Sequence, residues 1–484
     1  MTIENTILWI INHILFINFI LAILIVFFER RNPSSTWAWL MILFFVPILG
    51  FLLYLFIGQD LRKKKLFELK EEEEDQIHRM VHRQEKVLHQ KEIAYDYPNI
   101  QKCKDIIHLH LVGHNALYSQ DNIVDIYYNG YDKFEKMIED IEAAKDFIHI
   151  EYYIIRNDSL GKRVVELLAK KAREGVEVKL LYDGMGCIWL PKDFFKPLLE
   201  AGGEISCFLP PFLPYINLRV NYRNHRKICI IDGQKAYVGG INIGTEYLGL
   251  SKKMGFWRDT HLRIQGTAVD SLELRFLQDW RFCTKTPQII ESKYFPPKNV
   301  DGNTGIQIVS SGPDSKWSSI RNGFLKMISL SKERIYIHTP YLIPDDSLLE
   351  ALKIAALSGV DVRIIIPNKP DHMFVYWASL SYVGELLQAG VKCYTYEKGF
   401  IHSKMILVDD LVSTVGTANF DIRSFKLNFE VNAFIYDEEV NTRLYEQFLR
   451  DLEDSEEITY EIYKKRGFRI KFKESVSRLL SPML

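Results

Sequence analysis

Two long apolar runs open the chain, before a pattern of short strand-like and helix-like segments takes over. Residues 7–28 are almost wholly apolar, and residues 37–57 form a second run after a linker that contains Arg30 and Arg31. Each run approaches the ~20 residues that a helix needs to span ~30 Å of hydrocarbon. We therefore predict a two-helix membrane hairpin over residues 1–60. A cleaved signal peptide is the alternative for the first run, but no small-residue cleavage site follows it.

Charge beside these runs predicts their orientation. Four consecutive basic residues, 62–65, follow the second run, against two arginines in the linker. The excess of cations after the second span places the bulk of the chain in the cytoplasm. Residues 61–95 are charged and favour a helix, which predicts a solvated helical linker to the rest of the chain.

From residue 121 onward, strand-like and helix-like segments alternate, and the same order occurs twice. β-branched runs predict strands at 147–153, 176–182, 334–338 and 360–366, and helical periodicity predicts helices at 133–144, 160–174, 324–330 and 347–357. This alternation predicts an α/β fold with mixed, largely parallel β-sheets and flanking helices. We place two domains at residues 96–295 and 296–484 and expect a pseudo-two-fold axis to relate them.

One sequence pattern, H-x-K-x4-D-x6-G-x2-N, occurs once in each predicted domain, within residues 220–247 and 397–424. The first copy consists of His225, Lys227, Asp232, Gly239 and Asn242, and the second of His402, Lys404, Asp409, Gly416 and Asn419. Each copy lies in an apolar run that is typical of a buried strand. One such histidine alone would more often be a core residue, but a five-position pattern present twice indicates a functional site.

These residue types suit phosphoryl or phosphatidyl transfer without a metal ion. Residues i and i+2 of a strand share a face, so each histidine is expected beside its lysine. One imidazole can attack phosphorus and the other can protonate the leaving group, while two ammonium groups bind the non-bridging oxygens. We expect both pairs to meet at the seam between the domains, and we expect no cofactor.

The other motif residues receive supporting roles. We group Asp232 and Asp409 with the catalytic motif, although their odd offset from the lysines favours braces that bond local backbone over proton carriers. Small residues let backbone approach a ligand, and asparagine amides can donate hydrogen bonds to it. On these grounds we assign phosphate or substrate binding to Gly240, Asn242, Thr417 and Asn419.

Composition excludes some classes of function. Lys and Arg number 61 and Asp and Glu 62, so no overall basic excess indicates a nucleic-acid partner. The six cysteines are scattered, without a C-x-x-C pair, which indicates a reducing compartment and no disulfide framework. Three local segments suit contact with lipid, with ordinary core or solvated structure as the alternative: residues 208–216, 372–377 and the basic tail 464–473.

The two motifs resemble the HKD motifs of the phospholipase D superfamily, and their surroundings resemble bacterial cardiolipin synthases over essentially the whole chain. The segments that carry this resemblance are residues 30–39, 257–260, 423–425, 428–430 and 477–482. In that family each histidine has an orienting carboxylate downstream. The resemblance assigns these two roles to Asp259 and Glu430.

The resemblance implies a phosphatidyltransferase. One phosphatidylglycerol would pass its phosphatidyl group reversibly to another through a phosphatidyl-histidine, giving cardiolipin and glycerol, with His225 as the nucleophile and His402 as the acid. It also implies a multi-pass protein of the bacterial cell membrane, with its catalytic domains on the cytoplasmic side, in contact with anionic lipid. The resemblance leaves room for a homo-oligomer.

Three alternatives remain at this point. The first is a phospholipase D-type hydrolase or another phosphatidyltransferase, with water, ethanolamine or serine as the acceptor. A nuclease is disfavoured by the balanced charge and by the predicted hairpin. A membrane scaffold would have no need for two pairs of histidine and lysine on one face.

Overall fold

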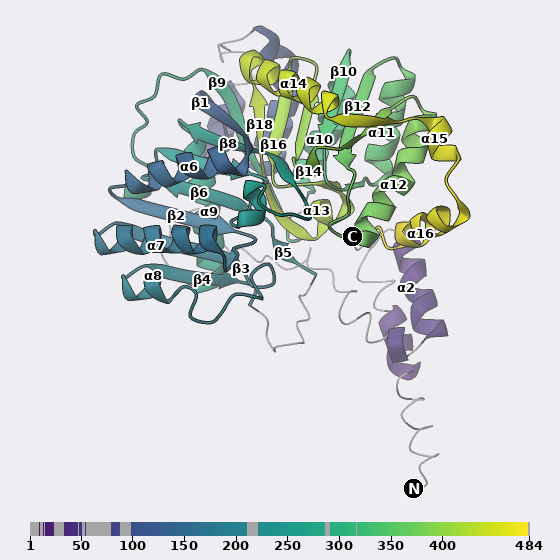
Figure 1. Ribbon diagram of the computed structural model, residues 1–484, viewed down its shortest axis with the longest axis horizontal. Coiled ribbons are helices and arrows are strands. Elements are labelled where there is room, and N and C mark those ends of the chain that lie inside the picture. Colours follow the sequence, from purple (N-terminus) through teal and green to yellow (C-terminus); the bar gives the residue numbers. More distant parts are fainter. Residues whose placement is uncertain are drawn as a thin grey trace. The chain divides into compact units, whose positions relative to one another are not determined.

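The computed structural model of the chain (Figure 1) divides it into two compact units. The first comprises Met1–Lys65 and Pro211–Tyr222, and the second Leu66–Pro210 and Arg223–Leu484. The residues that the structure describes are 9, 13, 15–23, 33–46, 48–50, 54, 79–87, 98–210, 221–285, 291–315 and 317–482.

The first unit contains α2 (Pro33–Phe45) and a helical stretch over residues 15–23. Asn18 Nδ2 donates a hydrogen bond to the Leu43 carbonyl at 3.1 Å, which joins the two predicted apolar segments. Among the residues described, no helix combines the length and the apolar character that a membrane crossing requires. Much of the predicted spans, residues 7–28 and 37–57, lies outside the described residues.

The second unit is built on strands that pair in one continuous order, β4-β3-β2-β6-β7-β8-β1-β9-β18-β16-β15-β10-β12-β13-β19. The strands are β1 (Tyr118–Asn129), β2 (Phe147–Tyr152), β3 (Glu177–Asp183), β4 (Glu204–Phe208), β5 (Arg223–Asn224), β6 (Lys227–Ile231), β7 (Lys235–Gly239), β8 (Phe256–Gln265), β9 (Thr304–Ser311), β10 (Arg334–His338), β11 (Leu342–Ile343), β12 (Asp361–Pro367), β13 (Lys392–Tyr396), β14 (Gly399–Ile401), β15 (Met405–Val408), β16 (Val412–Gly416), β17 (Phe420–Asp421), β18 (Asn428–Tyr436) and β19 (Ser455–Ile458).

Helices cover these strands. In Figure 1, α6, α7 and α8 lie together on the left and α11 and α12 on the right. The helical segments of this unit are η2 (Pro98–Cys103), α5 (Lys104–His114), α6 (Gly130–Glu142), α7 (Ser159–Arg173), α8 (Lys196–Glu200), η3 (Thr245–Leu248), α9 (Ala268–Thr284), η4 (Ser292–Tyr294), α10 (Ser319–Leu330), α11 (Asp346–Leu357), α12 (Met373–Gln388), α13 (Ile422–Lys426), α14 (Glu438–Glu453), α15 (Tyr460–Lys464) and α16 (Phe468–Leu479).

Local chemistry explains why these elements begin where they do. Asp158 accepts a hydrogen bond from the Gly161 amide at the start of α7, and Asp345 caps α11 in the same way. All residues of β2 and β6 are buried, as expected for strands covered on both faces. The eight strands and helices predicted above all form, and the largest difference is at α10, which begins at Ser319 rather than at residue 324.

The two halves of this unit share one order of pairing. In the first half β2, β3 and β4 are parallel and β6 runs antiparallel to β2; in the second half β10, β12 and β13 are parallel and β15 runs antiparallel to β10. Each half has its own hydrophobic core, one around α6 and α7 and the other around α10 and α11. The mixed sheet with flanking helices is therefore confirmed.

Two short strands cross from one half to the other. β5 pairs in parallel with the start of β18, and β14 pairs in parallel with the start of β8. Each of these strands ends directly before a motif histidine. The exchange joins the halves and, at the same time, places each histidine against the opposite half.

Candidate active site

Each motif histidine lies between an exchanged strand and a motif strand. The backbone amide of His225 donates to the Phe429 carbonyl at 2.9 Å, and that of His402 donates to the Arg258 carbonyl at 2.7 Å. We expected the histidines on the motif strands themselves, but β6 begins at Lys227 and β15 at Met405. Each histidine therefore lies just before its motif strand and not on it, because its backbone amide bonds a carbonyl of the other half.

A buried carboxylate from the opposite half orients each imidazole. His225 Nδ1 lies 3.0 Å from both carboxylate oxygens of Glu430, and His402 Nδ1 lies 2.9 Å from Asp259 Oδ2. The carboxylates are fully buried, and the imidazoles are only 8% and 7% exposed. Because these hydrogen bonds use Nδ1, the Nε2 atom of each imidazole can contact a substrate. The pairing is crossed: the carboxylate that follows the first motif serves the histidine of the second.

The motif lysines lie beside their histidines, as predicted. Lys227 Nζ donates to the His225 carbonyl at 2.5 Å, and Lys404 Nζ donates to the His402 carbonyl and lies 2.8 Å from His402 Nδ1. Burial lowers the pKa of Lys227 to about 7 and that of Lys404 to about 8. The charge of Lys404 lowers the pKa of Lys227 further, so the two pairs act on one another across the seam.

The electrostatics of the site favour neutral imidazoles and charged carboxylates. Burial lowers the pKa of His225 to about 4. Burial also lowers the pKa of His402, and the charge of Lys404 lowers it further. Burial opposes ionisation of both carboxylates, but their pKa values are lowered overall. The charge of Lys404 and the hydrogen bond with His402 lower the pKa of Asp259, and the interactions with His225 and Lys227 lower that of Glu430. A neutral imidazole with a carboxylate at Nδ1 has its lone pair at Nε2, the form that a nucleophile needs.

Asp232 and Asp409 act on the backbone. The carboxylate of Asp232 accepts hydrogen bonds from the amides of residues 145–147, and that of Asp409 from the amides of residues 332–334. Both residues adopt left-handed backbone conformations, with φ of 52° and 51°. This geometry is that of the brace interpretation. Neither carboxylate bonds a histidine in the described chain, and a direct catalytic part for these two residues stays a prediction.

The four residues assigned to substrate binding differ in what they contact. Asn242 Oδ1 accepts from the Ile154 amide and its Nδ2 donates to the Tyr247 hydroxyl, so this side chain is already used within the fold. Thr417 Oγ1 bonds the backbone of Val431. Of these four residues, Asn419 alone has a buried side-chain oxygen that bonds no other described residue. Gly240 packs against Asp259.

Several residues that support the site were missed by sequence reasoning. The Tyr153 ring meets the His225 ring edge-on, with centroids 4.9 Å apart, and Lys227 Nζ lies 5.3 Å from the same ring. Arg226 forms a buried ion pair with Asp279 at 2.6 Å, and Arg258 one with Asp451 at 2.7 Å. These contacts join residues 53 and 193 positions apart, so no local spacing could reveal them.

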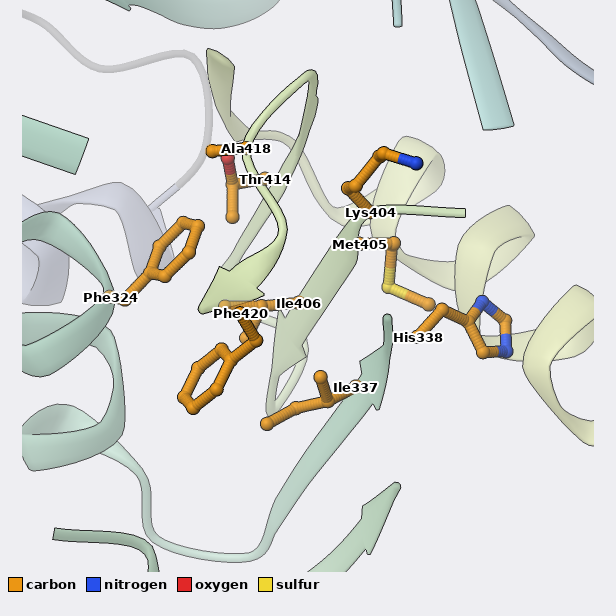
Figure 2. A pocket seen from close by; sticks show the side chains of 9 residues that line it. All are labelled: Phe324, Ile337, His338, Lys404, Met405, Ile406, Thr414, Ala418 and Phe420. Carbon is orange, nitrogen blue, oxygen red and sulfur yellow. The ribbon is translucent and has the colours of Figure 1, made fainter. Parts of the chain in front are cut away.

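A small cavity lies behind the second motif strand (Figure 2). Its volume is about 10 Å³, room for a single water molecule. In Figure 2 the ammonium of Lys404 points away from the phenyl rings of Phe324 and Phe420, which line the apolar side of the cavity. This cavity is too small for a lipid headgroup, and we assign it no part in binding.

Two imidazoles, each fixed by a carboxylate and accompanied by a lysine, define a phosphodiester-transfer enzyme of the phospholipase D type. A family model described as "Cardiolipin synthase, PLD-like domain" matches residues 137–280 and 324–452, and one described as "Phospholipase D-nuclease N-terminal" matches residues 16–59. The chain belongs to the cardiolipin synthase family.

Individual relatives agree with this assignment. The cardiolipin synthase of Listeria monocytogenes serotype 4b (strain F2365) is 51% identical over 472 residues, which cover 97% of this chain and 98% of that protein. The major cardiolipin synthase ClsA of Bacillus subtilis (strain 168) is 51% identical over 469 residues, which cover 97% of each chain. The crystal structure of a phosphatidylserine synthase from Haemophilus influenzae Rd KW20 has the same fold, with a TM-score of 0.60 at 14% identity over 80% of this chain and 100% of that one.

Gly240 should be needed to place Asp259. A Cβ atom at residue 240 would lie 2.1 Å from Asp259 Oδ1, so Gly240→Ala must displace the carboxylate that orients His402. We expect turnover to fall about 10- to 100-fold, as for loss of other orienting partners. The control is Gly113→Ala, where a Cβ would meet only Leu109 Cδ1 at 3.9 Å. Equal turnover in both variants, with unchanged melting temperatures, would contradict this role for Gly240.

The dependence of kcat/KM on pH should be bell-shaped. Below about pH 4, His225 gains a proton and loses its lone pair; above about pH 7 to 8, Lys227 and Lys404 lose the charge that attracts phosphate. In Lys227→Arg the guanidinium keeps its charge, so the alkaline limb should move from about pH 7 to the pKa of Lys404, about 8, even if the maximum is lower. Profiles of the two proteins measured from pH 4 to 10 test this. An alkaline limb at the same pH in both would assign that limb to another group.

Proposed function

We propose that this site passes a phosphatidyl group from one phosphatidylglycerol to the glycerol hydroxyl of a second, forming cardiolipin and glycerol without metal or nucleotide. The observation that carries the proposal is the crossed pairing of His225 with Glu430 and of His402 with Asp259. It gives one site two imidazoles with oriented Nε2 atoms and two adjacent ammonium groups. One exchange of phosphodiester bonds requires these groups and no others.

In the first step His225 Nε2 attacks the phosphorus of the donor, and the bond from phosphorus to the headgroup glycerol breaks. His402 protonates the departing glycerol oxygen, while Lys227 and Lys404 bind the non-bridging oxygens. In the second step the hydroxyl of the acceptor lipid attacks the phosphatidyl-histidine. The N–P bond breaks, and the hydroxyl proton passes to His402. The exchange is reversible because one phosphodiester bond replaces another.

The hydrogen bonds at Nδ1 support this division of roles. Among the described residues, His225 Nδ1 forms hydrogen bonds with the carboxylate of Glu430 alone, which favours the tautomer with a lone pair at Nε2. At His402 the Lys404 ammonium also approaches Nδ1, at 2.8 Å. Asp259 Oδ2 lies 2.9 Å from the same atom. Together with the negative charge of a bound phosphodiester, this carboxylate stabilises the imidazolium form of His402, whose Nε2 proton goes to the leaving oxygen.

Several features of the chain's organisation are part of the same proposal. Residues 1–60 form a membrane hairpin, residues 61–95 link it to the catalytic halves 96–295 and 296–484, and these halves are related by a pseudo-two-fold axis and face the cytoplasm. The apolar runs support the hairpin, and the matching strand order supports the axis. An anionic membrane then supplies both lipid substrates.

The products formed from labelled phosphatidylglycerol test the function. Purified full-length chain in phosphatidylglycerol vesicles should convert the label to cardiolipin and release one glycerol per cardiolipin, as measured by mass spectrometry. Added glycerol should reverse the reaction. Phosphatidic acid as the main product would show a hydrolase instead, and phosphatidylserine or phosphatidylethanolamine formed on addition of serine or ethanolamine would show a different acceptor.

A phosphatidyl donor with a p-nitrophenyl leaving group tests the two histidine roles. This leaving group departs without protonation, so His402→Ala should still release close to one nitrophenol per chain and retain a phosphatidyl-enzyme. His225→Ala should release none. Both variants should lose at least ~10²-fold activity with phosphatidylglycerol. A burst in His225→Ala and none in His402→Ala would reverse the assignment.

A further inference from the structure

The last helix of the chain presents an apolar stripe to solvent. On α16, Phe468 is 82% exposed, Phe472 60% and Leu479 81%, and Val476 lies beside them. At 3.6 residues per turn these four side chains fall within an arc of about 80° on the helix. Large apolar side chains that gather on one exposed face, rather than singly, mark an interaction surface.

The opposite face of α16 is fixed to the second unit. Glu474 and Ser477 are buried there, and Arg466 pairs with Glu474 at 2.9 Å. Arg478 pairs with Glu385 of α12, and Lys473 Nζ lies 5.0 Å from the Trp377 ring of the same helix. The apolar stripe therefore points outward from a helix whose orientation is set by packing, and it does not belong to a loose tail.

Cations flank this stripe on both sides. Residues 464–479 contain seven lysines and arginines and a single acidic residue, Glu474. Around the helix, Arg469 and Lys473 fall on one side of the stripe, and Lys471 and Arg478 on the other. Arg469 and Lys471 are exposed. An apolar stripe between two rows of cations is the pattern of a helix that lies in the surface of an anionic bilayer.

We propose that α16 docks flat on an anionic lipid bilayer, with its apolar stripe inserted among the lipids and the exposed cations Arg469 and Lys471 on the headgroups. The positive charge around the stripe favours a lipid bilayer over a protein as the partner, because a protein would need a matching acidic surface. Anionic headgroups attract each cation with about a fivefold gain in binding. The inference goes beyond the proposed reaction and does not depend on turnover.

The test measures immersion of the helix in the full-length chain. A nitroxide label at Phe472→Cys is compared with one at Tyr131→Cys on α6, an aromatic position that is similarly exposed at 63%. The label's collision rate with oxygen, which enters lipid, is divided by its collision rate with a nickel chelate, which stays in water. On vesicles that contain phosphatidylglycerol, this ratio should rise several-fold at residue 472 and stay at its solution value at residue 131. Labelled wild type measures the background from its native cysteines.

Charge is tested on the same label. Arg469→Gln with Lys471→Gln should lower the ratio at residue 472 several-fold, whereas Lys162→Gln with Lys170→Gln on α7, which removes two exposed cations elsewhere, should not. An unchanged ratio at residue 472 on anionic vesicles would overturn the proposal. Equal immersion in vesicles of phosphatidylcholine alone would also overturn it. The same holds if the label is shielded from both reagents in detergent solution, because protein would then cover this face.

Discussion

The crossed pairing of imidazole and carboxylate is the interaction on which the rest of the second unit depends. Asp259 and Glu430 are fully buried, and a buried charge without a partner costs several kcal/mol. The partner of each is supplied by the opposite half, through a histidine whose backbone amide also bonds there. Within its own half Asp259 accepts from the Thr260 amide and Glu430 from Asn428 Nδ2, which are neutral donors, so the titratable partner of each comes from the opposite half. The interaction that assembles the halves is thus the interaction that orients the catalytic groups.

Burial then sets the charge state of the site before substrate arrives. It lowers the pKa of both lysines and both histidines, so the free site holds its positive charge at a cost. A phosphodiester is negatively charged, so it stabilises the cations of the site. Its binding offsets that cost and favours the protonated lysines and one protonated imidazole. The substrate therefore completes the electrostatics that the reaction needs.

Sequence reasoning succeeded where structure is local and failed where it depends on distant pairing. β10 was predicted at its observed ends, 334–338, because this run is β-branched and apolar. The odd offset of Asp232 from Lys227 correctly favoured a brace. The crossing of the carboxylates was not predicted, because it rests on β5 and β14, which have two and three residues and no periodicity. Of residues 372–377, which we singled out for contact with lipid, all but the first lie in α12, and Met373 and Phe374 are exposed.

The same helix α12 connects the proposed membrane face to the chemistry. It carries α16 through Trp377 and Glu385, and it begins directly after Asp371 and His372. The Tyr341 hydroxyl donates to Asp371, whose charge raises the pKa of His402 and Lys404 against the effect of burial. One helix thus contacts α16 through Trp377 and Glu385 and begins next to a carboxylate that acts on the second histidine–lysine pair.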